Sequence, residues 1–120
     1  MRVLLVDDEE ELVSALAERL SLRGIDADWV STCHDALARV ESQTFDIAVL
    51  DVKMPKMSGF ELKERLHKKF PHMKFIFVTG HGSEADYETG AVEGGQDYYL
   101  VKPVKIELLI EKMKQILGEA

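Results

Sequence analysis

Short apolar runs alternate with amphipathic helical patterns along the whole chain, and this alternation constrains the fold more than any other feature. The runs are strand-sized and rich in β-branched or aromatic residues, and they cover residues 3–6, 47–50, 75–78 and 98–101. Unbroken apolar runs of this kind are typical of strands covered on both faces, as in a parallel sheet. In residues 25–30, by contrast, Ile25, Ala27 and Trp29 alternate with acids, which indicates a half-exposed edge strand.

Helical patterns fill the intervals between the apolar runs. Apolar residues recur at helical spacing within residues 12–20, 36–40, 62–70, 87–92 and 106–117. The third pattern opens with Ser58-Gly59-Phe60-Glu61, which is typical of a capping box, and Pro71 ends it. The fourth is the weakest, because Gly90 interrupts it. Strand followed by helix, five times over, predicts an α/β fold with a parallel sheet and helices on both faces.

Size and composition narrow the class of protein. A length of 120 residues fits one compact domain, so we expect a single domain over residues 1–120, either complete or cut from a longer protein. No apolar run approaches the ~20 residues of a membrane helix, and the lone Cys33 favours a reducing compartment, so a cytoplasmic protein is expected. The net charge of -7 argues against direct binding of nucleic acid.

Polar side chains stand where the predicted strands end. They are Asp7 and Asp8 after the first strand, Asp51 at the end of the third, Thr79 at the end of the fourth and Lys102 after the fifth. Each alone has a plainer explanation: acids cap helices, an acid suits a turn, and a lysine suits the surface. Because the carboxyl ends of parallel strands meet at one edge, we expect all five to converge there, where such sheets bind ligands.

Three crowded carboxylates repel one another unless a cation lies among them. Carboxylate oxygens are the ligands that Mg²⁺ prefers, whereas zinc would require closely spaced cysteines or histidines, and here these residues are scattered. A metal and a lysine together would neutralise a phosphoryl group. The hydroxyl of Thr79 could bond a phosphoryl oxygen, and the carboxylate of Asp51 could be the nucleophile that forms an aspartyl phosphate.

Four stretches around these positions resemble the receiver domains of response regulators, the CheY-like phospho-acceptors of two-component signalling. The stretches are residues 4–9, 51–59, 78–82 and 97–103, and the likeness spans essentially the whole chain. The resemblance implies a doubly wound, five-stranded parallel sheet with the flavodoxin-like strand order 2-1-3-4-5. It also implies that the chain is a signalling phosphoprotein that catalyses its own phosphorylation and dephosphorylation without being a turnover enzyme.

The resemblance implies a role for each residue of the metal and phosphorylation site. Asp51 would receive the phosphoryl group from a histidine of a sensor kinase or phosphotransfer protein. Asp8 would bind Mg²⁺ directly and Asp7 through water, while Asp51 and the backbone carbonyl of Lys53 would complete the protein ligands. Lys53 also sits at the entrance to the site, where it is expected to influence how long the phosphoryl group survives.

The resemblance further implies a conformational switch. Lys102 would pair with one phosphoryl oxygen, and its peptide bond to Pro103 would be cis. Thr79 would move inward to bond another oxygen, and Tyr99 would follow it. A tyrosine at this point of a strand could equally be an ordinary core or edge residue. The movement would change the face formed by the fourth helix, fifth strand and fifth helix, where an effector domain, a target protein or a second copy would dock.

Three other functions compete with this interpretation. A phosphatase or dehalogenase with an aspartate nucleophile needs a second acid two residues later, where this chain has Lys53. A nucleotide or flavin binder needs a glycine-rich first turn, where this chain has Asp-Asp-Glu-Glu-Glu. A docking module of the same fold that works without phosphorylation typically lacks one of the acids or the lysine, and none is missing here.

Overall fold

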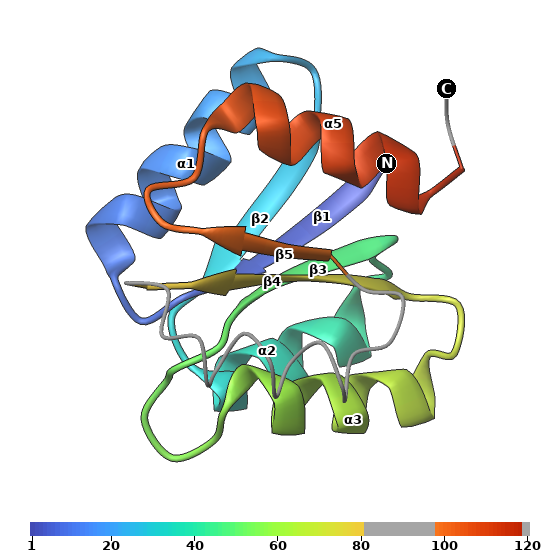
Figure 1. Cartoon of the computed structure of the whole chain (residues 1–120). Helices are drawn as coiled ribbons and strands as arrows, with labels where there is room; N and C mark the ends of the chain where they lie inside the picture. Colours follow the sequence, from blue (N-terminus) through green and yellow to red (C-terminus); the bar gives the residue numbers. More distant parts are fainter. Residues whose placement is uncertain (81–97, 119–120) are drawn as a thin grey trace.

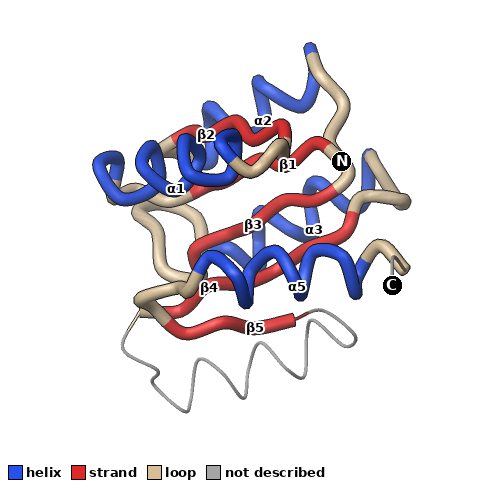
Figure 2. Tube along the Cα trace, turned by 90° about the horizontal axis from the view of Figure 1, so that it is seen from above, coloured by secondary structure: helices blue, strands red, loops and turns tan. Residues whose placement is uncertain are grey.

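The structure, a computed structural model, describes residues 1–80 and 98–118. Its centre is a five-stranded parallel sheet in the order β2-β1-β3-β4-β5, as predicted (Figures 1 and 2). The strands are β1 (Arg2–Val6), β2 (Asp26–Val30), β3 (Ile47–Asp51), β4 (Lys74–Thr79) and β5 (Tyr98–Val101). The prediction that residues 25–30 form an edge strand is confirmed by the position of β2. The expected helix around residues 87–92 lies outside the described residues.

The described helices cover both faces of the sheet. Figure 1 shows α1 (Glu10–Leu22) and α5 (Ile106–Ile116) on one face, and α2 (Cys33–Ser42) and α3 (Gly59–Lys69) on the other. No helix in the described part of the chain is long and apolar enough to cross a bilayer.

Two buried cores lie on opposite faces of the sheet, and this explains the unbroken apolar runs. Successive side chains of a strand point to opposite faces, so each strand supplies both cores. In β1, Val3 and Leu5 pack beneath α1 and α5, whereas Leu4 and Val6 pack beneath α2 and α3. All four are at most 1% exposed. A polar residue in the middle of β1 would therefore be buried whichever way it pointed.

Side-chain caps fix where two of the helices begin. The hydroxyl of Thr32 accepts a hydrogen bond from the amide of Asp35 at the start of α2, and that of Ser58 accepts one from the amide of Glu61 at the start of α3. Such caps satisfy amides that have no partner within the helix. The predicted capping signal at Ser58 is thereby confirmed.

One residue of the predicted apolar stripe of α1 lies outside the core. Val13, Ala17 and Leu20 are buried against the sheet, but Leu12 is 58% exposed. Consecutive residues of a helix are about 100° apart around its axis, so Leu12 is turned away from the line that faces the sheet. It faces a cleft beside the carboxyl ends of the strands instead.

Candidate functional site

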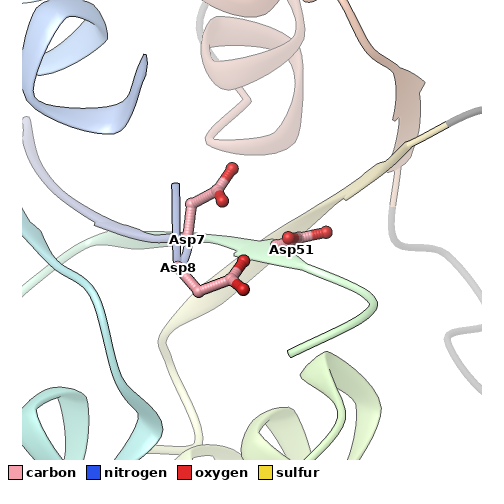
Figure 3. Close-up of side chains that lie close together, drawn as sticks. All are labelled: Asp7, Asp8 and Asp51. Atoms are coloured by element: carbon pink, nitrogen blue, oxygen red, sulfur yellow. The ribbon is translucent and has the colours of Figure 1, made fainter. Parts of the chain in front are cut away.

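Three carboxylates gather where β1 and β3 end. Asp7 and Asp8 directly follow β1, and Asp51 is the last residue of β3 (Figure 3). One ligand oxygen from each lies within 4.8 Å of the other two. The side chain of Asp51 is only 6% exposed and that of Asp7 14%, whereas Asp8 is exposed. The cluster therefore has two sheltered carboxylates and one that opens to solvent.

The backbone around Asp51 is held by its neighbours in the fold. The amide of Val52 donates to the carbonyl of Val78, and the amide of Gly59 donates to the carbonyl of Val52. A β-carbon at Gly59 would lie 2.4 Å from the carbonyl oxygen of Asp51, so only glycine lets α3 begin this close to β3. The amide nitrogen of exposed Lys53 lies 3.4 Å from Oδ1 of Asp51.

Lys102 reaches the cluster from the end of β5. Its ammonium nitrogen lies 2.8 Å from Oδ2 of Asp7, 2.9 Å from Oε1 of Glu9 and 3.4 Å from Oδ2 of Asp51. Its amide donates a 2.8 Å hydrogen bond to the carbonyl of Thr79, and its peptide bond to Pro103 is cis. The sequence did not predict the contact with Glu9, because Glu9 and Lys102 are 93 residues apart.

Burial and charge shift the pKa values of Asp51 and Lys102. Burial, and then the negative charge of Asp7, raise the pKa of Asp51 to about 6, although Lys102 acts in the opposite direction. Burial alone would lower the pKa of Lys102, but its hydrogen bonds to Asp7 and Glu9 and the charges of Asp51 and Asp7 outweigh this and raise it. The site therefore carries more negative charge than Lys102 compensates, and it favours a further cation.

Thr79 presents a buried hydroxyl at the end of β4, one residue beyond Val78, which pairs with Asp51. The residue is 3% exposed, and its Oγ1 has no hydrogen-bond partner among the described residues. An unpaired buried hydroxyl is costly, so a hydrogen-bond partner that reached it would be bound favourably.

Tyr99 lies one strand away, directly opposite Phe77 in the pairing of β4 with β5. The two rings stack with their centroids 5.1 Å apart and an interplanar angle of 15°. Tyr99 is half-buried and packs against the core beneath α2 and α3. This arrangement suits a core residue and a switch residue alike.

The residues of the cluster fit Mg²⁺. Within residues 1–80 and 98–118, Asp7, Asp8 and Asp51 form the one group of three or more acids, histidines or cysteines close enough to share a metal ion. All the donors are hard carboxylate oxygens, which favours magnesium or calcium over zinc. Cys33 is buried elsewhere, with its thiol near the carbonyl oxygen of Met57.

A cleft of about 460 Å³ leads to the cluster from the side of α1. Apolar residues dominate its walls: Leu12 and Leu16 from α1, and Pro103 and Val104 from the chain after β5. Asp51 and Lys102 also line it. The largely buried side chain of Asp51 therefore borders this cleft.

Comparisons with known proteins agree with this geometry. A family model described as the response regulator receiver domain matches residues 3–114. The transcriptional regulatory protein TcrA of Mycobacterium tuberculosis is 32% identical over 116 residues, which are 97% of this chain and 46% of TcrA. The alkaline phosphatase synthesis transcriptional regulatory protein PhoP of Bacillus subtilis is 33% identical over 116 residues, which are 97% of this chain and 48% of PhoP.

A solved structure gives the same result. The CheY-like response regulator receiver domain protein of Methanospirillum hungatei JF-1 is 36% identical, with a TM-score of 0.86, and the match covers 98% of this chain and 93% of that one. The chain spans about half the length of the first curated relatives. The resemblance found in the sequence is thus confirmed, and the chain belongs to the response regulator receiver domains, which are signalling modules of two-component systems.

Proposed function

We propose that this domain accepts a phosphoryl group on Asp51, in a reaction that depends on Mg²⁺. The phosphoryl group would come from a phosphohistidine of a sensor kinase or phosphotransfer protein. The observation that carries the proposal is the convergence of a buried nucleophilic carboxylate, two further acids and a lysine at one edge of the sheet. Phosphoryl transfer requires little more than such positioning and charge neutralisation.

Each side chain has a distinct task in the transfer. A carboxylate oxygen of Asp51 attacks phosphorus, and the P–N bond of the phosphohistidine breaks with its electron pair remaining on the imidazole nitrogen. Lys102 donates a hydrogen bond to one phosphoryl oxygen, and the hydroxyl of Thr79 donates to another. Asp7, Asp8, Asp51 and the carbonyl of Lys53 would hold Mg²⁺, which when bound neutralises charge on the phosphoryl oxygens.

The pKa of Asp51 suits this task at neutral pH. A value of about 6 leaves the carboxylate mostly ionised at pH 7, and so able to attack. Burial keeps it poorly hydrated, which strengthens its interactions with cations. The cleft along α1 supplies the path by which a phosphodonor would reach it.

Phosphorylation would be transmitted through β4 and β5. A phosphoryl oxygen that draws in Thr79 also acts on Lys102, because the backbones of these residues are hydrogen bonded. Tyr99, stacked on Phe77, would respond by changing its position, and the face that includes β5 and α5 would change with it. An effector domain, a target protein or a second copy would bind that face.

We further propose that residues 1–120 are one receiver domain that works in the cytoplasm. It would act alone or as part of a longer regulator, since the first curated relatives are about twice as long. Its net charge of -7 favours protein partners over direct contact with nucleic acid.

The test is phosphorylation of the purified chain by acetyl phosphate, with and without Mg²⁺. We expect intact-mass analysis after rapid acid quench to detect one phosphoryl adduct, dependent on Mg²⁺ and absent from Asp51→Asn. Beryllofluoride, which mimics the phosphoryl group, should change the fluorescence of Trp29 or the tyrosines in the same Mg²⁺-dependent way. If neither adduct nor fluorescence change is found, a docking module that works without phosphorylation becomes the better interpretation.

A further inference from the structure

The ammonium group of Lys102 is fully engaged by carboxylates. It has three N–H donors, and it lies 2.8 Å from Asp7, 2.9 Å from Glu9 and 3.4 Å from Asp51. Of these acids, Glu9 has no part in the metal cluster or in the proposed transfer. Any phosphoryl oxygen that binds Lys102 must displace or share one of these three partners.

Glu9 is the partner most easily displaced. Its side chain is 52% exposed, compared with 14% for Asp7 and 6% for Asp51, so its carboxylate can be hydrated at little cost once it leaves Lys102. Asp7 has no such freedom, because its Oδ1 accepts a hydrogen bond from the amide of Glu9 and its Oδ2 lies against Lys102.

The orientation of Glu9 is set by Lys102 rather than by its own helix. Glu9 is the N-cap residue of α1, yet its side chain makes no capping hydrogen bond. The carboxylate bonds Lys102, 93 residues further along the chain, instead. A negative charge is held at the edge of the phosphorylation site as a result.

We propose that Glu9 is a positioning residue that competes with the phosphoryl group for Lys102. This inference rests on the proposed function of the site. Before phosphorylation, Glu9 shares the ammonium group of Lys102 with Asp7 and Asp51. After phosphorylation, Lys102 exchanges Glu9 for a phosphoryl oxygen, and the released carboxylate repels the phosphoryl group. Glu9 thereby limits how tightly the site holds a phosphoryl group.

The test compares Glu9→Gln with Glu11→Gln by beryllofluoride titration at saturating Mg²⁺. Both variants lose one negative charge from the start of α1, but only the first loses a partner of Lys102. We expect Glu9→Gln to bind beryllofluoride about two- to fivefold more tightly than the wild type, the range of a partly exposed ion pair. Glu11→Gln should change the affinity by less than about twofold, because exposed charges at a distance are screened.

A second comparison establishes whether Glu9 acts through Lys102. In a Lys102→Met background, Glu9→Gln should change the affinity for beryllofluoride no more than Glu11→Gln does. If the role of Glu9 were purely structural, Glu9→Gln would still change this affinity more than Glu11→Gln. Unfolding by urea verifies that each variant is folded.

The outcomes separate this inference from the function on which it rests. Equal effects of Glu9→Gln and Glu11→Gln, or weaker binding by Glu9→Gln, would overturn the competition while leaving phosphorylation of Asp51 in place. If the wild type binds no beryllofluoride at saturating Mg²⁺, the proposed function itself fails, and the competition fails with it.

Discussion

A β-carbon on Gly59 would lie 2.4 Å from the carbonyl oxygen of Asp51, closer than any side chain tolerates. The contact is with backbone, which cannot yield as a flexible side chain could. The start of α3 is therefore built directly against the residue proposed to accept the phosphoryl group. Residue 59 determines the position of the Asp51 backbone without contributing a side chain.

Gly59→Ala is expected to destabilise the fold. The added methyl group must push α3 away from β3, and overpacking of this kind costs about 1–3 kcal/mol of the free energy of unfolding. Urea unfolding followed by the fluorescence of Trp29 measures the loss. Gly80→Ala is the control, since among the described residues its β-carbon would meet only a side-chain atom of Lys102, at 4.0 Å. An equal loss in both variants would show that the close contact is not the cause.

Asp51→Asn is expected to stabilise the fold at pH 7 when no metal is present. Because the folded-state pKa of Asp51 is about 6, above the ordinary 3.8, folding is opposed wherever this carboxylate is ionised. The contribution of Asp51 to the free energy of unfolding falls as the pH rises from about 4 to about 6. Asn removes this penalty, so the gain should be on the order of 3 kcal/mol at pH 7.

The pH dependence of this gain distinguishes it from a packing effect. Urea unfolding in EDTA at several pH values should show the difference between Asp51→Asn and wild type disappearing below about pH 3, where Asp51 is protonated in both states. Glu64→Gln, at an exposed position on α3, controls for the loss of one negative charge. A gain that stays constant over the whole pH range contradicts the argument.

Mg²⁺ is expected to stabilise the wild-type chain through the acid cluster. A ligand that binds only the folded state adds about 2.7 kcal/mol at a concentration 100 times its dissociation constant. Asp8→Asn removes one ligand of the cluster and should lose most of this gain, while Glu64→Gln should retain it. Thermal unfolding over a range of Mg²⁺ concentrations measures the effect. A response of Asp8→Asn equal to that of the wild type would place the ion elsewhere.

The sheet and the approximate position of the site could be predicted from the sequence because both depend on strong local patterns. The apolar run at residues 3–6 has no polar member since β1 supplies cores on both faces, and that pattern predicts a central strand. Once the strands are known, Asp7, Asp51 and Lys102 must lie at one edge, because every pair of strands is parallel.

Contacts that depend on side-chain conformation could not be predicted in this way. Glu9 and Lys102 are 93 residues apart, and nothing in the run of acids after Asp7 indicates which of them turns toward the lysine. Leu12 fits the apolar stripe of α1 by spacing, yet it is exposed because Val13 and Ala17 already define the side that faces the sheet. Periodicity predicts a helix and its general apolar side, but it does not fix the rotation of the helix to within one residue.

Thr79→Val is expected to separate the stability of the fold from phosphoryl binding. The hydroxyl of Thr79 is buried and has no partner in the described part of the structure. Val has nearly the same shape and lacks this hydroxyl, so the substitution should raise the free energy of unfolding by about 1 kcal/mol. It should also weaken beryllofluoride binding about tenfold, because one hydrogen bond to the phosphoryl mimic is lost. Thr79→Ser keeps the hydroxyl and should do the reverse, losing stability with its methyl group while retaining the affinity. If Thr79→Val loses stability, the hydroxyl already has a partner in the folded protein.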